Sequence, residues 1–260
     1  MLKTRLIPVL LLKDGYIVKS ISFEKYQATG NPFEEVERFN QWQVDELIYL
    51  NISGKSSDFQ FRADTNIKDK ISYIDLIKII NRNCFMPLTW GGGIRSFEEI
   101  EKILISGADK VALNTLIVKD PNIIKRTVNK FGSQVVVASA DIKKNRDDYF
   151  VFIENGKKNT NLKIDEWINH VMTLNVGELL IQSMDRDGTN LGYDIELLKK
   201  IKKLTDLRVI FLGGVGKYED FIDGAKNGAS GLAAANIWHY KELVDLNAKK
   251  ILKSNGINVR

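Results

Sequence analysis

Short apolar runs alternate with longer amphipathic segments along the whole chain. The runs are continuous rather than alternating, which is typical of strands buried on both faces of a parallel sheet. The segments between them, for example residues 96–107 and 193–204, repeat apolar residues at helical spacing. We therefore expect strands and helices to alternate. The expected strands are Leu6–Leu12, Glu46–Ile52, Pro87–Trp90, Lys110–Asn114, Val135–Ala140, Glu178–Ser183, Val209–Leu212 and Gly231–Ala235.

Eight such units predict an α/β protein with a (β/α)8 TIM-barrel fold, which commonly needs about 250 residues. The chain has 260 residues. No proline- or serine-rich linker and no low-complexity run divides the sequence, so we expect a single domain over residues 1–260. The main alternative is a doubly wound open sheet.

An internal repeat indicates that the barrel consists of two halves. Residues 91–115 (GGGIRSFEEIEKILISGADKVALNT) match residues 213–236 (GGVGKYEDFIDGAKNGASGLAAAN), and residues 45–53 (DELIYLNIS) match residues 177–185 (GELLIQSMD). This offset of about 120 to 130 residues predicts half-barrels at about residues 1–130 and 131–260.

The first strand of each half ends differently. The stretch RLIPVLLLKDGYIVK, residues 5–19, aligns with VVVASADIKK, residues 135–144, when Lys13 is superposed on Lys143. Leu11 then falls where the second copy has Asp141. One half therefore ends its strand in a carboxylate, and the other half ends it in a leucine.

Composition excludes several classes of protein. The chain is 44% hydrophobic and 27% charged, with a net charge of +5, which is ordinary for a soluble globular protein. That charge fits either an anionic ligand such as a phosphate or lysines scattered over helix surfaces. No basic run with interleaved aromatic residues argues for nucleic acid. The N-terminal apolar run is too short for a signal peptide and nothing resembles a membrane span, so we expect a cytoplasmic protein.

Metal and disulfide chemistry are also disfavoured. Cys84 is the single cysteine, and His170 and His239 are the two histidines. A disulfide framework, a thiolate metal site and a histidine-rich metal site are therefore not expected. We expect neither a metal ion nor another cofactor.

Glycines after two pairs of neighbouring strands indicate phosphate binding at the mouth, which is the end of the barrel where the strands finish. Glycine lets backbone N–H groups approach an anion closely. A single glycine pair is equally consistent with a plain turn, but two symmetry-related sets predict a ligand with two phosphates. The segment DRDGTN, residues 185–190, adds groups for ribose hydroxyls or a phosphate. The candidate residues are Gly92, Gly93, Asn114, Thr115, Asp187, Gly188, Thr189, Gly213, Gly214 and Asn236.

At the opposite end of the barrel, the floor, four expected strands begin with charged residues. These are Arg5, Glu46, Lys110 and Glu178. Solvation of the rim, with a contribution to stability, is the ordinary explanation for such charges. A ring of two cations and two anions that closes the floor is the alternative.

The sequence resembles the cyclase (synthase) subunit of imidazole glycerol phosphate synthase from near residue 1 to the C-terminal INVR. The motifs that carry the resemblance are KDGYIVK, DELIYLNI, GGGI, GADKVALNT, FGSQVVVASADIK, GKKNT, SMDRDGTNLGYD and GGVGK. In that family a ribotide with two phosphates spans the mouth. A glutaminase docks on the floor, and its ammonia enters the barrel through a salt-bridged gate. The resemblance implies that Arg5, Glu46, Lys110 and Glu178 form that gate here.

The resemblance also gives meaning to Leu11. In the family both half-barrels end their first strand in an aspartate, and the pair performs the acid–base steps of ring closure and cleavage. Asp141 matches one aspartate, and the position of the other is lost at Leu11. Losing one general acid or base commonly costs about 10²–10⁴ in rate. Asp14 matches a different aspartate of the family, and the strand-two aspartate of the family is Asn51 here.

Because this aspartate is missing, the sequence resembles a branch of the family whose members are encoded with surface-polysaccharide or nonulosonic-sugar genes. For that branch the resemblance implies ammonia transfer to a sugar amidotransferase at the mouth, which turns an N-acetyl group into an acetamidino group. One alternative is an active cyclase of histidine biosynthesis, which makes imidazole glycerol phosphate and aminoimidazole carboxamide ribotide with Asp141 and with Asp14 or a bound water. The other alternative is a non-catalytic scaffold.

Three features stay open at the level of sequence. Trp90 precedes the glycine loop and could narrow the mouth or lie in the core. Lys157 and Lys158 could lie over a ligand or at a solvated hairpin tip. The long connection over residues 53–70 is expected on the mouth side.

Overall fold

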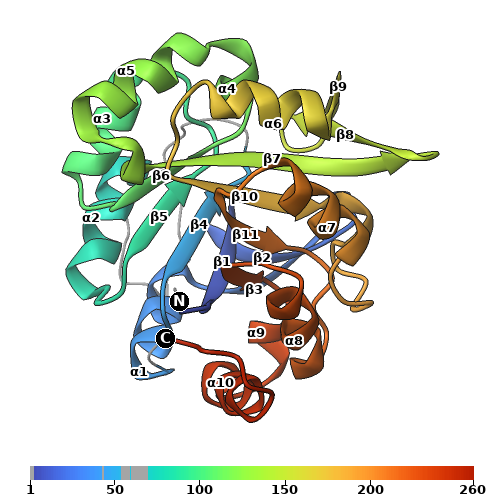
Figure 1. The fold of residues 1–260 in the computed structure, drawn as a ribbon. Coiled ribbons are helices and arrows are strands. Elements are labelled where there is room, and N and C mark those ends of the chain that lie inside the picture. The colour runs from blue at the N-terminus through green and yellow to red at the C-terminus, as the bar shows by residue number, and fades with distance from the viewer. Residues whose placement is uncertain (1–2, 43, 54–58, 60–69) are drawn as a thin grey trace.

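The computed structural model describes residues 3–42, 44–53, 59 and 70–260, and it shows a closed barrel of parallel strands (Figure 1). Each barrel strand pairs with two parallel neighbours, and the ring closes where β1 pairs with both β12 and β4. The (β/α)8 prediction is therefore confirmed, whereas the division into half-barrels stays a prediction. The strands are β1 (Arg5–Lys13), β4 (Leu47–Asn51), β5 (Leu88–Gly91), β6 (Lys110–Leu113), β7 (Val136–Asn145), β10 (Glu178–Ser183), β11 (Arg208–Leu212) and β12 (Gly231–Ala234).

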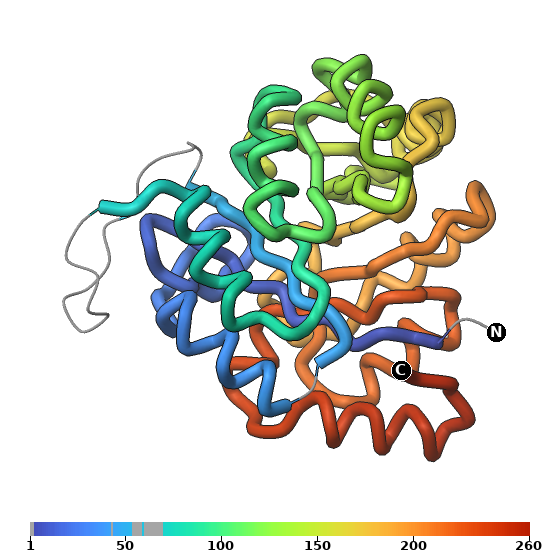
Figure 2. The backbone as a smooth tube through the Cα atoms, turned by 90° about the vertical axis from the view of Figure 1, so that its left-hand side faces the viewer, coloured from blue at the N-terminus to red at the C-terminus, as the bar shows by residue number. Residues whose placement is uncertain are grey.

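Helices surround the barrel on its outside, as the backbone trace also shows (Figure 2). Several begin at a side-chain cap: Ser72, Ser96 and Asp194 accept hydrogen bonds from backbone N–H groups of the first turn. The helices are α1 (Pro32–Trp42), α2 (Tyr73–Asn83), α3 (Phe97–Ile105), α4 (Thr115–Lys119), α5 (Pro121–Phe131), α6 (Ile164–Met172), α7 (Ile195–Leu204), α8 (Tyr218–Lys226), α9 (Ile237–Tyr240) and α10 (Val244–Ser254), with 3-10 turns η2 (Ser133–Val135) and η3 (Met184–Arg186).

Two antiparallel hairpins extend the first strands of the two predicted halves beyond the barrel. The strands β2 (Tyr16–Ile21) and β3 (Lys25–Gly30) follow β1, and β8 (Asp148–Ile153) and β9 (Lys158–Lys163) follow β7. The turn from β1 to β2 is formed by Asp14 and Gly15, which have positive φ angles of 49° and 87°. Because each hairpin continues a strand past its mouth end, both lie beside the mouth.

The molecule has two apolar layers. The larger one packs the outer faces of the strands against the helices, and the smaller one fills the barrel interior. Trp90 belongs to the outer layer: its side chain is fully buried and stacks on Tyr49 with ring centroids 5.7 Å apart. Trp90 is thus a core aromatic and does not narrow the mouth.

Most of the long connection after β4 falls at residues 54–58 and 60–69, which lie outside the described residues. Within the described part of the chain, Phe59 and Ile71 form an isolated antiparallel bridge. None of the helices in that part is both long and apolar enough to cross a membrane.

Candidate functional site

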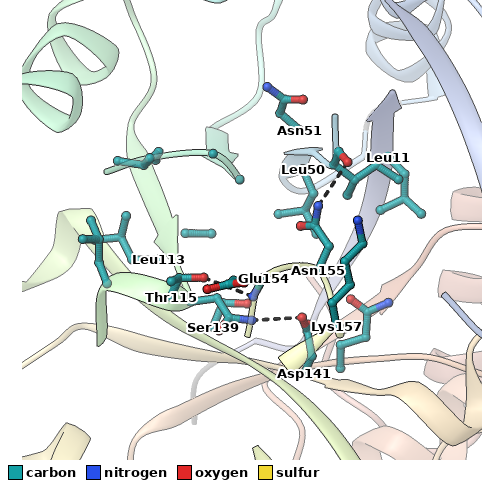
Figure 3. A pocket seen from close by; sticks show the side chains of 18 of the residues that line it. Leu11, Leu50, Asn51, Leu113, Thr115, Ser139, Asp141, Glu154, Asn155 and Lys157 are labelled. Carbon is teal, nitrogen blue, oxygen red and sulfur yellow. Dashed lines mark hydrogen bonds between the residues drawn. The ribbon is translucent and has the colours of Figure 1, made fainter. Parts of the chain in front are cut away.

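The strands end around a cavity of about 760 Å³ at the mouth. Leu11 from β1 and Asp141 from β7 both line it, together with side chains from the first predicted phosphate site (Figure 3). Ser139 and Gln182, which also line it, belong to barrel strands. The mouth cavity is therefore the top of the barrel interior.

Asp141 is the carboxylate placed at the base of this cavity. The side-chain amide of Asn114 donates a hydrogen bond to Asp141 Oδ2 over 3.0 Å. Burial and the nearby charge of Asp187 raise the pKa of Asp141 to about 7, although the hydrogen bond from Asn114 opposes the shift. A carboxyl group with this pKa can both give and take a proton near neutral pH.

Leu11 gives its side of the cavity a different character. It is 4% exposed and pairs in register with Leu50, whereas Asp141 pairs with Gln182. The barrel strands therefore present leucines at Leu11 and polar side chains at Asp141. Asp14, the suggested substitute, lies in the β1–β2 turn, and its backbone N–H donates to Ser53 Oγ over 2.9 Å. It is not among the residues that line the cavity.

The first predicted phosphate site, formed by Gly92, Gly93, Asn114 and Thr115, lines the mouth cavity as expected. Gly92 has a φ angle of +86°, and a Cβ atom there would lie 2.1 Å from the carbonyl oxygen of Asn51. Only glycine fits this close approach of two backbones. The cations Arg95, Lys119 and Lys157 line the same cavity.

The β8–β9 turn closes over this first site. The backbone N–H of Glu154 donates to Thr115 Oγ1 over 3.3 Å, and its carboxylate pairs with Lys119 at 2.5 Å. The amide of Asn155 donates to the carbonyl oxygen of Ile52 over 3.1 Å. Lys157 follows in the turn and extends into the cavity (Figure 3). Of the two lysines in GKKNT, Lys157 therefore lies over the cavity, whereas Lys158 begins β9.

The second predicted phosphate site is covered. Asp187, Gly188, Gly213, Gly214 and Asn236 line a separate notch of about 20 Å³. Thr189 does not line it; its hydroxyl donates to the carbonyl oxygen of Arg186 over 2.9 Å.

The cover is the tip of the β2–β3 hairpin. Ser20 Oγ donates to Asp187 Oδ2 over 2.6 Å, and the Asn236 amide donates to the Ser20 carbonyl oxygen over 3.1 Å. The backbone N–H of Ser22 donates to the carbonyl oxygen of Asp187 over 3.1 Å. The two candidate sites thus differ: the first opens into the cavity, and the second is closed by a hairpin.

Both sites keep an unused polar atom. Among the described residues, the side-chain oxygens of Asn114 and Asn236 are buried and have no hydrogen-bond partner. Each of them is a hydrogen-bond acceptor that a ligand or a water molecule would satisfy.

The four charged residues at the floor form one ion-pair network. Arg5 bonds to Glu46 at 2.6 Å and also to Glu178, and Lys110 lies 3.1 Å from Glu46 and 3.4 Å from Glu178. Although burial alone would raise it, the pKa of Glu46 is lowered by the charges of Arg5 and Lys110. The charges therefore face one another across the floor instead of solvating its rim.

Sequence reasoning missed one group of polar side chains at the mouth. Ser20, Phe23 and Tyr26 of the β2–β3 hairpin line the cavity, as do Ser139 and Gln182 of the barrel. Ser20 and Tyr26 meet at the cavity because they pair in the register of β2 and β3. We had not predicted strands there, because the segment has few apolar residues.

The sequence is similar over its whole length to proteins of known family. A family model described as "Histidine biosynthesis protein" matches residues 5–244. The chain belongs to this family. It is also 39% identical over 262 residues to the imidazole glycerol phosphate synthase subunit HisF of a Hydrogenobaculum species, with both chains covered completely. The HisF subunit of Streptococcus mutans is 37% identical over 262 residues, again with both chains covered completely. That of Endomicrobium trichonymphae is 41% identical over 261 residues, which cover all of this chain and 96% of the relative.

Membership of the histidine biosynthesis protein family confirms the resemblance drawn from the motifs. The similarity to HisF subunits runs through the floor ring, both glycine pairs and the mouth cavity, because it covers the whole chain. These three relatives carry a single name, and that name says nothing of a sugar pathway. The diverged branch therefore belongs to the proposal that follows.

Proposed function

We propose that this chain is the cyclase-type subunit of a glutamine-dependent synthase, in which ammonia crosses the barrel from floor to mouth. One observation carries the proposal: a closed ring of four charges and a cavity with an ionisable carboxylate lie at opposite ends of one barrel interior. The similarity to subunits named after imidazole glycerol phosphate synthase supports the same assignment.

The interior between floor and mouth suits a neutral molecule. Side chains on the inward face of the strands form a separate apolar cluster, which includes Ile7, Val9, Ile48, Val137, Leu180 and Ile210. An ion would lose its hydration among such side chains at a large cost, whereas uncharged ammonia loses far less. An apolar barrel interior therefore favours passage of ammonia over ammonium.

A glutaminase would dock where the helices lead into the strands. Three large apolar side chains stand out from those connections: Phe85 is 86% exposed, Ile105 is 77% exposed and Met172 is 50% exposed. Phe85 precedes β5, Ile105 ends α3 and Met172 ends α6, so all three lie on the floor side. Exposed apolar residues around the charged ring are typical of a protein interface.

The chemistry at the mouth is the finer part of the proposal. Asp141 is retained and Leu11 stands in the position of its partner, so we propose that the cyclase reaction is slow. The ammonia would then serve a second acceptor, a sugar N-acetyl amidotransferase that forms an acetamidino group. A fully active cyclase of histidine biosynthesis is the second candidate, and the full-length similarity to HisF subunits favours it. The retained ring and cavity argue against a scaffold.

The deciding experiment measures turnover of the phosphoribulosyl-formimino ribotide with excess ammonium by the purified chain. The comparison protein is a cyclase that has both aspartates. A rate lower by at least about 10²-fold is expected if the second carboxylate is needed. Turnover at the rate of the comparison cyclase would instead establish the histidine-pathway enzyme. If the glutaminase encoded by a neighbouring gene failed to bind this chain at micromolar concentration, the ammonia-conducting role would be contradicted.

A further inference from the structure

Next to the position of the missing carboxylate, the β2–β3 hairpin places a phenol. In the register of the strands, Leu11 pairs with Val18, Val18 with Ala28, and Ser20 with Tyr26. Side chains two residues apart on a strand share a face. Leu11, Val18, Ser20 and Tyr26 therefore lie on one face of this three-stranded extension.

That face is turned to the mouth cavity. Leu11, Ser20 and Tyr26 all line the cavity. Tyr26 also packs against the apolar cluster of the barrel interior that contains Leu11 and Val18. Lys19, the next residue along β2, points the other way, and its ammonium group bonds to Tyr240 over 2.8 Å.

Polar contacts fix the Tyr26 hydroxyl at this position. It donates to the carbonyl oxygen of Phe23 over 2.8 Å, and its ring lies 4.2 Å below the ammonium group of Lys13. Ser20, its partner in the register of β2 and β3, donates a hydrogen bond to Asp187 Oδ2. Burial and the charges of Asp187 and Asp141 raise the pKa of Tyr26, so the phenol stays protonated and lies within electrostatic reach of Asp141.

We propose that Tyr26 is a catalytic residue of the cyclase reaction, acting as the proton donor that faces Asp141 across the mouth cavity. This inference rests on the proposed function, because it requires the ribotide of the family to enter the cavity. A proton donor at this position would give a chain with leucine at position 11 some turnover. A phenol can donate a proton, but with its pKa raised it is a poor base, so the turnover stays slow.

The proton balance of the step is simple. When ammonia adds to a carbonyl carbon and forms an imine, two protons pass from nitrogen to oxygen and the oxygen leaves as water. Asp141 accepts a proton as an N–H bond breaks, and the carbonyl oxygen accepts a proton as the O–H bond of Tyr26 breaks. The phenolate then regains a proton from Asp141 through solvent in the cavity. A second round completes the water, and both side chains end as they began.

The test is a double-mutant comparison with the ribotide and excess ammonium. Tyr26→Phe should lower kcat of the natural chain by at least about tenfold with little change in KM. In the Leu11→Asp background the same change should have a clearly smaller effect, because the new carboxylate supplies the proton. Ser20→Ala should lower kcat by a smaller factor than Tyr26→Phe.

Tyr16→Phe is the matched control. Tyr16 lies on the same hairpin and packs against the same interior cluster, but it does not line the cavity. Its substitution should leave kcat unchanged, and unfolding temperatures should show that all variants fold.

Three outcomes would overturn the role of Tyr26. They are an unchanged kcat in Tyr26→Phe, an equal loss in both backgrounds, and no turnover by the natural chain where Leu11→Asp is active. The last of these would leave the proposed ammonia-conducting function standing.

Discussion

Leu11 and Asp141 end barrel strands that carry the two hairpins, and both side chains line one cavity, yet one is a hydrocarbon and the other an acid with a pKa of about 7. Their strand neighbours follow the same division, since Leu11 pairs with Leu50 and Asp141 pairs with Gln182. The leucine at position 11 therefore has an apolar neighbour, where the aspartate at position 141 has a polar one.

The first prediction concerns Leu11→Asp. We expect this variant to turn over the ribotide faster than the natural chain, because strands, cavity and Asp141 are all in place. The new carboxylate would be buried beside Leu50 and Val18, which should raise its pKa and destabilise the fold by about 1–3 kcal/mol. Ammonium-dependent kinetics and urea unfolding measure the two effects. Leu11→Asn is the control, since it adds polarity without an acid and should give no rate increase.

The second prediction follows from the raised pKa of Asp141. Between the ordinary pKa of an aspartate, about 3.9, and the folded value, the folded state binds more protons than the unfolded state. The free energy of unfolding should therefore fall as the pH rises from about 4 to about 7.

Asp141→Asn tests this sign. The variant should gain stability relative to the natural chain over that pH range, by on the order of 4 kcal/mol, and the gain should level off above it. Thermal unfolding at several pH values measures the gain. The exposed Asp206, changed to asparagine, should show no such trend. A constant difference between the natural chain and Asp141→Asn at all pH values would contradict the prediction.

The third prediction concerns the floor ring. Lys110 contacts both Glu46 and Glu178, so Lys110→Ala removes two of the four links in the network. We expect turnover with ammonium to persist, while the product formed per glutamate released by the bound glutaminase falls well below one. Lys78→Ala removes an exposed ion pair with Asp75 in the first half of α2, outside the floor ring, and serves as the control. Tight coupling in Lys110→Ala would show that the ring does not guide ammonia.

The fourth prediction separates the two phosphate sites. Inorganic phosphate should bind first at Gly92 and Gly93, because that site is open, whereas the second site is covered by the β2–β3 hairpin. Gly92→Ala should abolish this binding, since its Cβ would overlap the backbone of Asn51. Calorimetric titration measures the affinity. Gly256→Ala is the control: Gly256 also has a positive φ angle, but no atom lies within 4 Å of the added Cβ.

The sequence predicted the barrel well because a strand buried on both faces leaves a local signal, a short continuous apolar run. It also placed Arg5, Glu46, Lys110 and Glu178 together at the floor, since each stands at the start of a strand, but these positions fitted rim solvation as well, and only the family resemblance favoured the ring. The position of Trp90 stayed open, because the side of the sheet to which it points depends on the register with Tyr49.

The mouth was harder to predict. Tyr26 and Ser20 lie together at the mouth only because the hairpin returns on itself, and the apolar pattern of β3 is too weak to reveal that strand. The closed state of the second site depends on hydrogen bonds between Ser20 and residues more than 160 positions away. Contacts at such separations are set by the tertiary fold, and local sequence carries no record of them.

The apolar interior above the floor ring has a consequence for proton supply. In the proposed function, an ammonium ion at the floor must lose a proton before it crosses this interior. The nitrogen then reaches the mouth as ammonia, which is a base. There it meets Asp141, which is still partly protonated at neutral pH. At lower pH the protonated carboxyl group of Asp141 would give its proton to ammonia. The ammonium ion formed in this way cannot attack a carbonyl carbon. If the proposed function holds, the barrel delivers a reactive nitrogen, and the ionisation of one aspartate decides whether it stays reactive.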